Sequence, residues 1–296
     1  ILEILREMKH RQPLPYSQAR VLVLLVALVC CVGTSHYEER LSRAQQLYGD
    51  NEVSDALKEL RLAADEIPAR AEAFIALGKL LMGIGKMQEA LAALEGALAA
   101  LARDPDANRE CIRANATPGF RTSTPTALWT NVATLRYQNG DPQGAAEGCK
   151  EALKLTPDHA RCLYIYAVSC LTTDAWSKQE SRVESSLRAA LKLFKSPDEA
   201  SSAAYALGTL HLRQGQLEKA RVAFDACLKN APEHFEARMR QGEVLSRMGY
   251  HVLALKHFLR AERTQPGAAE PRIQAGNALR RQKRFSEALE KYGGVL

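Results

Sequence analysis

The chain of 296 residues is long enough to bury a sizeable core, and its 46% hydrophobic residues are typical of a folded protein rather than a disordered one. The formal net charge of +6 is modest, and basic residues alternate with acidic ones, so no nucleic-acid-binding surface is predicted. Only 6% of the residues are aromatic, which favours a core of small aliphatic side chains between closely packed helices.

The first part of the chain is a basic, amphipathic segment over residues 1–16, followed by an apolar segment over residues 17–35. We interpret the apolar segment as a helix that anchors the chain in a membrane. The anchoring side chains would be Val21, Leu24, Leu25, Leu28 and Val32. The uncharged stretch between Arg20 and His36 has 15 residues, whereas a membrane-spanning helix usually has about twenty.

Two other interpretations of this apolar segment stay open. The basic residues Lys9, Arg11 and Arg20 precede it and small residues follow it at 33–35, as in a secretory signal peptide. The segment could also be a buried helix that caps the folded body or docks into a partner. A glycosylation sequon at Asn115 would fit a secretory lumen. We expect a membrane-associated protein, and the choice between the endomembrane system and another organellar membrane stays open.

The rest of the chain is repetitive. The stretch LGTLHLRQGQLEKARVAFDACLKNAP at 207–232 aligns with QGEVLSRMGYHVLALKHFLRAERTQP at 241–266, an offset of 34 residues. Further copies begin at Tyr37, Ala71, Thr126 and Ala160, and the copy from Ala160 loses register after Cys170 and regains it about four residues late. This pattern resembles the tetratricopeptide repeat, in which Gly, Ala, Phe and Pro recur at fixed places.

The resemblance implies an all-α, right-handed solenoid of about seven helix-turn-helix repeats, preceded by the N-terminal apolar helix. Repeats one and two would occupy residues 37–104, and repeats three to seven residues 126–296, the last being incomplete. Small residues such as Gly208 and Gly242 would let paired helices approach closely, and Phe224 and Phe258 would fill the gap to the next repeat.

An inserted loop is predicted over residues 105–125, where the repeat pattern fails and Pro, Thr, Asn and Arg are frequent. Loops of this length in compact folds often have a function, although this one could also be an ordinary surface insertion.

Signatures of chemistry are missing from the sequence: it has no HExxH, no paired CxxC, no phosphate-binding glycine loop and no GxSxG. We therefore predict no catalytic residue, no cofactor and no metal site. The seven cysteines lack the spacing of a disulfide framework. Cys149, Cys170 and Cys227 fall at positions that the repeat buries, so we expect them to act as small hydrophobic residues.

A row of arginines is the one candidate binding site. Arg213, Arg247 and Arg281 occupy the same place in three successive repeats, and Arg240 and Arg280 lie nearby in the sequence. The resemblance places them near the ends of first helices, facing the groove, where guanidinium groups could grip an acidic peptide. The alternative is that cations at helix C-termini only offset the helix dipole.

The function predicted from the repeat is a non-catalytic scaffold that binds other proteins, and specifically an accessory or assembly subunit of a membrane-associated complex. Its partners would be other subunits or peptide segments in the groove of the repeats. A lumenal adaptor of the co-chaperone type is one alternative. The repeat-containing arm of a larger enzyme, with its catalytic domain outside this chain, is another.

Overall fold

The computed structural model describes residues 36–104, 124–173 and 177–294. Every regular element in these ranges is a helix, so the all-α fold predicted from the repeat is confirmed. The predicted anchor over residues 17–35, the sequon at Asn115 and the loop over 105–123 lie outside the described residues. None of the helices within the described residues is long and apolar enough to cross a membrane.

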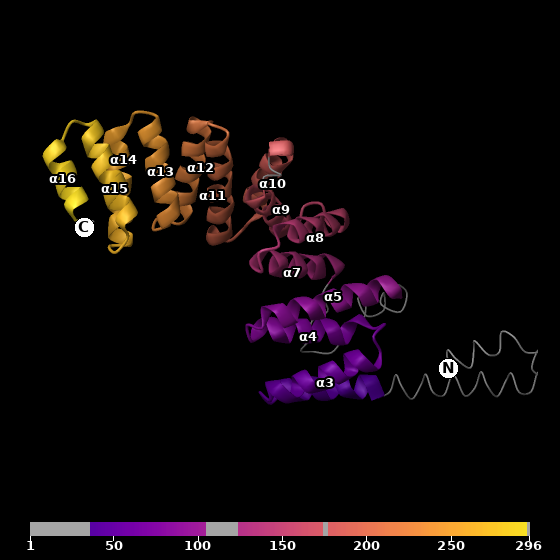
Figure 1. Ribbon diagram of the computed structural model, residues 1–296. Helices are drawn as coiled ribbons and strands as arrows, with labels where there is room; N and C mark the ends of the chain where they lie inside the picture. The colour runs from indigo at the N-terminus through magenta and orange to yellow at the C-terminus, as the bar shows by residue number, and fades with distance from the viewer. Residues whose placement is uncertain (1–35, 105–123, 174–176, 295–296) are drawn as a thin grey trace, which may run out of the picture. The chain divides into compact units, whose positions relative to one another are not determined.

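The chain divides into two compact units, residues 1–124 and 125–296. The described residues of the first unit, 36–104, form two helix pairs: a helix over residues 36–49 with α3 (Val53–Glu66), and α4 (Ala71–Gly83) with α5 (Met87–Arg103) (Figure 1). Tyr37 joins the two pairs, because its side chain is fully buried and its hydroxyl oxygen accepts a hydrogen bond of 3.2 Å from the Ala73 backbone N–H.

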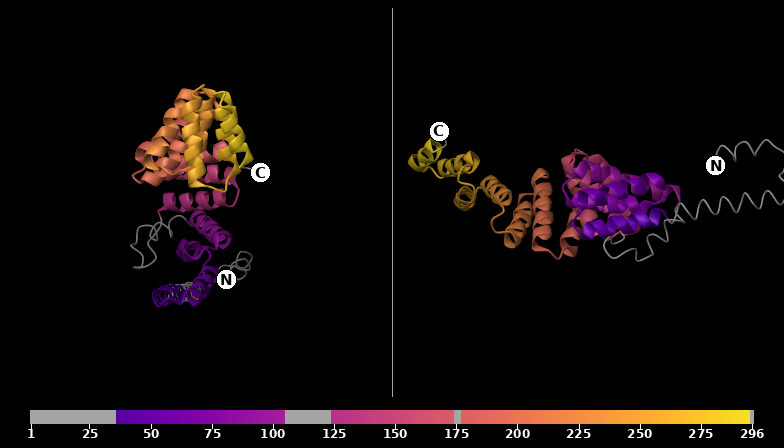
Figure 2. Two further views of the ribbon diagram at one scale, coloured as in Figure 1. Left: turned by 90° about the vertical axis from the view of Figure 1, so that its left-hand side faces the viewer. Right: turned by 90° about the horizontal axis from the view of Figure 1, so that it is seen from below.

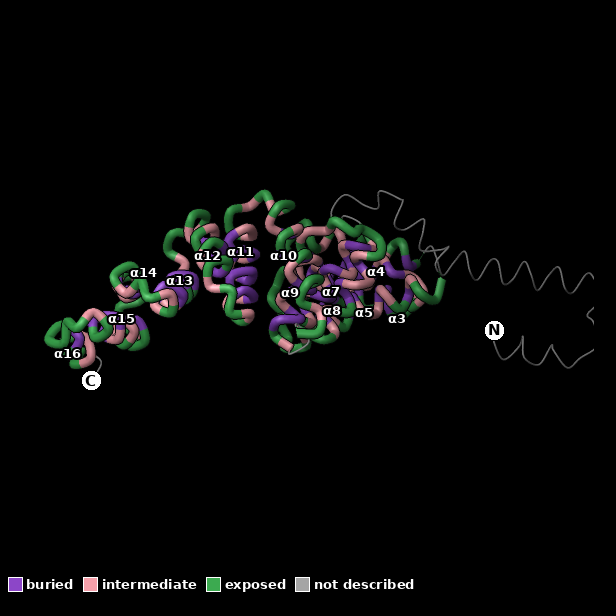
Figure 3. The backbone as a smooth tube through the Cα atoms, turned by 90° about the horizontal axis from the view of Figure 1, so that it is seen from above, coloured by how far each residue is buried: buried purple, intermediate pink, exposed green. Residues whose placement is uncertain are grey.

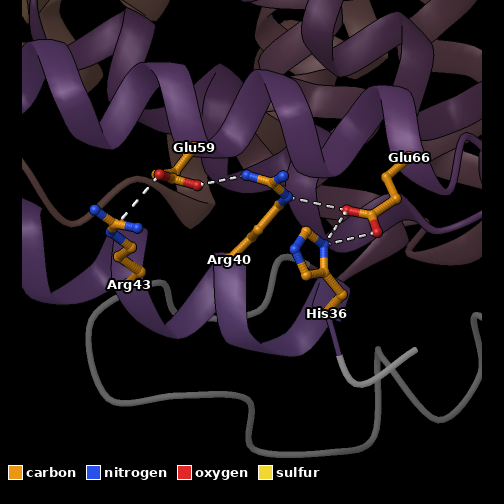
Figure 4. Close-up of polar contacts among 5 residues, drawn as sticks. All are labelled: His36, Arg40, Arg43, Glu59 and Glu66. Atoms are coloured by element: carbon orange, nitrogen blue, oxygen red, sulfur yellow. Dashed lines mark hydrogen bonds and ion pairs between the residues drawn. The ribbon is translucent and has the colours of Figure 1, made fainter. Parts of the chain in front are cut away.

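Ion pairs hold the first helix of this unit against α3 (Figure 4). Arg40 donates to Glu59 at 2.9 Å through Nη1 and to Glu66 at 3.0 Å through Nε, and His36 lies 2.9 Å from Glu66. Arg43 is 3.7 Å from the second oxygen of Glu59. All five side chains therefore tie the two helices of the first repeat together rather than facing a partner.

In the second unit the described residues form five helix pairs, which follow one another along the chain (Figures 1 and 2). The pairs are α7 (Pro125–Gln138) with α8 (Pro142–Leu155), α9 (Ala160–Thr172) with α10 (Glu180–Leu193), α11 (Pro197–Arg213) with α12 (Leu217–Asn230), α13 (Phe235–Arg247) with α14 (His251–Thr264), and α15 (Ala269–Arg281) with α16 (Phe285–Gly293). Each helix packs against the next one along the chain.

First helices of successive pairs in this unit also contact one another: α7 meets α9, α9 meets α11, and α11 meets α13. In a curved stack, the layer whose members lie closer together is on the inside of the curve. The first helices therefore form the inner face of the second unit and the second helices its outer side. In Figure 3, buried residues run along α11 and α13, while the turns between helices are exposed.

Glycines set the spacing within each pair, as predicted. A Cβ atom added at Gly208 would lie 2.6 Å from the ring of Phe224, and one at Gly242 would lie 2.5 Å from the ring of Phe258. A Cβ atom added at Gly276 would likewise overlap the ring of Tyr292. The rings therefore fill space inside their own pair, in addition to the predicted contact with the next pair, such as that of Phe224 in the buried cluster with Val244.

The irregular repeat has its extra residues in one connection. Three residues, 214–216, join α11 to α12, and three, 248–250, join α13 to α14. Seven residues, 173–179, join α9 to α10, four more than in those regular pairs. This connection is where the sequence loses its repeat register.

Candidate functional site

A hollow of about 140 Å³ opens on the inner face of the second unit, where three successive first helices meet. It is lined by Tyr205 of α11, by Phe235, Glu236, Met239, Arg240 and Glu243 of α13, by Phe258 of α14, and by Glu270 and Gln274 of α15. The α13 residues recur every three or four positions, so they share one side of that helix. The hollow is thus a product of the repeat, because it needs the same side of three helices.

Aromatic rings hold the α11 side of the hollow. The ring of Tyr205 stacks on His234 with centroids 5.1 Å apart and lies 5.9 Å from the ring of Phe224. His234 is itself fixed at the start of α13, where its Nδ1 accepts a hydrogen bond of 3.3 Å from the Ala237 backbone N–H. Contacts within the chain therefore fix this side of the hollow without a bound partner.

Charge in the hollow is predominantly negative, with three glutamates and one arginine in the lining. Arg240 donates to Glu243 at 2.9 Å, and Arg247 donates to the other oxygen of Glu243 at 2.7 Å. The hydrogen bond that Arg240 donates to Glu243 raises the pKa of Arg240. Glu270 has no ion-pair partner within the described residues, and Glu236 has only His234, at 3.2 Å, which is a cation only when protonated. Two carboxylates are therefore available to a cationic ligand.

The structure does not gather the five predicted arginines into one site. Arg240 lines the hollow, whereas Arg213, Arg247 and Arg281 lie in the last turns of α11, α13 and α15. The guanidinium of Arg213 donates to the backbone carbonyl of Leu171 at 2.6 Å, and Arg247 is held by Glu243. The grip on an acidic peptide stays a prediction.

Arg280 and Arg281 differ from the other arginines of the row. Both are exposed at the end of α15, and within the described part of the chain neither has an ion-pair partner. They leave a cationic edge at the C-terminal end of the helix whose first turn carries Glu270.

Of the residues that line the hollow, the sequence analysis singled out Arg240 alone as a binding residue, and it missed the apolar part. Phe235, Met239 and Glu243 are each four residues apart in α13. This spacing was visible in the sequence and would have placed them on one side of the helix.

The buried cysteines are the remaining side chains that the sequence analysis considered. Cys149, Cys170 and Cys227 are free and buried, as predicted, and Cys162 is also buried, with its sulfur 3.0 Å from the Thr130 hydroxyl. In the described ranges, no group of His, Cys, Asp or Glu side chains could hold a metal ion.

Comparison with known proteins agrees with this architecture. A tetratricopeptide-repeat family model matches residues 180–226 and 205–269, and a second one matches residues 73–108. The chain therefore contains tetratricopeptide repeats. The fold of this family is that of a scaffold for protein–protein interaction, and its members are typically non-catalytic. No curated protein sequence matches this tetratricopeptide-repeat chain significantly.

Solved tetratricopeptide structures resemble it in fold. A tetratricopeptide repeat protein from Parabacteroides merdae is 16% identical, with a TM-score of 0.56, over 88% of this chain and 92% of that one. PilF of Pseudomonas aeruginosa is 17% identical, with a TM-score of 0.56, over 75% and 88%. YrrB, described as a tetratricopeptide protein with an unusual peptide-binding site, is 20% identical, with a TM-score of 0.50, over 65% and 92%. At these identities the likeness shows the fold alone.

Proposed function

We propose that the inner face of α11, α13 and α15 binds a segment of a partner protein without catalysing a reaction. The observation that carries this proposal is the hollow, because its lining comes from three successive repeats and combines exposed carboxylates with aromatic walls. A partner side chain that enters it would bury apolar surface and gain an ion pair. The peptide-binding site named for YrrB supports the same use of the fold.

The charges on this face predict the chemistry of the bound segment. Glu236 and Glu270 lie in the first turns of α13 and α15, and Arg247 and Arg281 lie in the last turns, eleven positions further along each helix. Eleven positions correspond to roughly 16 Å of helix. The partner would place a Lys or Arg side chain in the hollow and an Asp or Glu side chain near the arginines in the last turns of α13 and α15. The helix dipole favours the same distribution of charge.

The location of the scaffold is part of the same proposal. The apolar residues 17–35 would anchor the chain, which would make it an accessory or assembly subunit of a membrane-associated complex. The uninterrupted apolar run VLVLLVALVCCV supports this, and so does the basic segment before it.

Cross-linking mass spectrometry on the native protein, purified from membranes in mild detergent, tests both parts. We expect a stoichiometric set of partners with cross-links on the inner face and around residues 17–35. Varied, substoichiometric clients of a freely soluble protein would overturn the membrane-complex part and favour an adaptor.

Charge-neutralising variants then test the inner face with the partner that this experiment identifies. Glu236→Gln with Glu270→Gln should weaken binding by about twofold to thirtyfold, since each of the two partly exposed ion pairs contributes roughly 0.2–1 kcal/mol. Arg280→Gln with Arg281→Gln should weaken it by a similar factor. Glu180→Gln, at the exposed start of α10, is the matched control. Unchanged affinity in both double variants would show that the partner binds elsewhere.

A further inference from the structure

A second groove lies on the outer side of the second unit, between α10 and α12, with α11 as its floor. We call it the outer groove. It has a volume of about 440 Å³, and its apolar lining comes from Leu191 of α10, Leu207 of α11, and Val222 and Ala226 of α12. The Val222 residue is 56% exposed. The groove therefore presents apolar surface to any molecule that approaches the second helices.

The stacking of repeats does not require this apolar lining. Leu207, Val222 and Ala226 can be compared with the residues 34 positions later, which occupy the same places in the next repeat. Those residues are Gln241, Lys256 and Arg260. A polar or cationic residue thus replaces each apolar one, while the buried positions of the same helices keep Ala and Phe. A groove of about 430 Å³ recurs two repeats later between α14 and α16, but there Glu262, Glu287 and Glu290 stand beside its leucines. Neither later repeat therefore has an apolar residue at the place of Val222.

Charge at the edges of the outer groove is positive. Lys192 of α10 and Lys219 of α12 both line it, and neither has an ion-pair partner among the described residues. The other two charged groups of the lining are compensated within their own helices: Arg188 has a carboxylate of α10 at 2.6 Å, and Glu218 has a guanidinium of α12 at 2.9 Å. One uncompensated lysine therefore stands on each wall.

We propose that the outer groove binds an amphipathic helix of a partner protein, with its apolar side on Leu191 and Val222 and acidic residues on both flanks. Each flank would meet one lysine, Lys192 on one wall and Lys219 on the other. The apolar stretch of this chain, residues 21–32, does not fit, because Lys9, Arg11 and Arg20 precede it and would be repelled. This contact is independent of the inner face, so one scaffold would hold two partners, or two parts of one partner, on opposite layers of helices.

Two synthetic helical peptides test this assignment on the full chain. They share one leucine-rich side and a photo-cross-linking group, and differ only in acidic or basic flanks. In fluorescence anisotropy we expect the acidic peptide to bind and to cross-link to α10 and α12. Val222→Lys, which installs the residue found one repeat later, should weaken binding by about tenfold or more, because the valine no longer contributes buried apolar area. Lys192→Glu with Lys219→Glu should transfer the preference to the basic peptide.

Val252→Lys is the matched control, because Val252 lies on α14, outside the groove, and is 58% exposed. It should leave binding unchanged. Equal binding of both peptides, cross-links on α13 or α15, or equal effects of the two valine substitutions would overturn the proposal. So would concentration-dependent self-association that Val222→Lys abolishes, since a second copy of the chain would then be the occupant.

Discussion

Adding one methyl group at Gly242 tests the packing that sets the distance between paired helices. The Cβ of Gly242→Ala would lie 2.5 Å from the Phe258 ring, about 1 Å closer than a favourable carbon–carbon contact. The ring is 2% exposed and lies in a buried cluster with Met239 and Leu245, so it could shift only toward the hollow that it lines. Such overpacking costs roughly 1–3 kcal/mol, and replacing a helical glycine by alanine returns up to about 1 kcal/mol. We expect a net loss of about 1–2 kcal/mol in the free energy of unfolding.

Urea unfolding followed by circular dichroism measures this loss as a shift of the midpoint at constant slope. Gly293→Ala is the matched control: Gly293 is also helical and in the same unit, but an added Cβ would meet no atom within 4 Å. The control should be neutral or stabilising. If Gly242→Ala proved as stable as the control, the ring-on-glycine contact would not set the helix spacing.

Three further predictions concern single residues. Lys283 has a φ of 63° at the position that Gly215 occupies two repeats earlier, so Lys283→Gly should stabilise the protein by roughly 0.5–1 kcal/mol in urea unfolding. Tyr37→Phe removes the acceptor of the buried Ala73 N–H and should destabilise the protein by about 1–3 kcal/mol in the same assay. Burial raises the pKa of Cys227 to about 11, so iodoacetamide should label it slowly in the native protein even at about pH 9.

The outcomes that would contradict these predictions are equally specific. A destabilising Lys283→Gly would show that the left-handed turn at this position carries no strain. A neutral Tyr37→Phe would mean that water or another group satisfies the Ala73 N–H. Because the pKa of Cys227 is higher in the folded than in the unfolded state, where it is near 9, the thiol should lower stability as pH rises from about 9 to 11. Labelling of native Cys227 as fast as in urea would contradict its burial.

Much of the fold could be predicted because the repeat relates residues at a fixed separation. The close approach of paired helices at Gly208 and Gly242 was predicted and is confirmed, whereas the packing of Phe224 and Phe258 on those glycines was not predicted, since the sequence analysis placed the rings against the next repeat. The pairing of Glu243 could also have been predicted, since an acid three or four residues from a base lies beside it on a helix.

Other features depend on contacts that no local spacing encodes. Arg213 donates to the carbonyl of Leu171, 42 residues earlier, across the irregular connection between α9 and α10. The outer groove likewise brings Leu191 together with Val222 from different repeats, on either side of α11. The repeat pattern predicts that these helices are neighbours. It does not predict which side chains line the space between them, because the residues that meet there are not 34 positions apart in the sequence.

The packing of each ring on the glycine of its own helix pair affects how such a chain can gain repeats. The complementary shapes lie within one stretch of sequence, so a duplicated pair brings along both halves of its interior. A tandem duplication of 34 residues, for example of 235–268, would thus supply a new unit whose own interior is already complementary. A stack of this kind can acquire new partner surfaces by copying, and the copies can then diverge on the exposed positions alone.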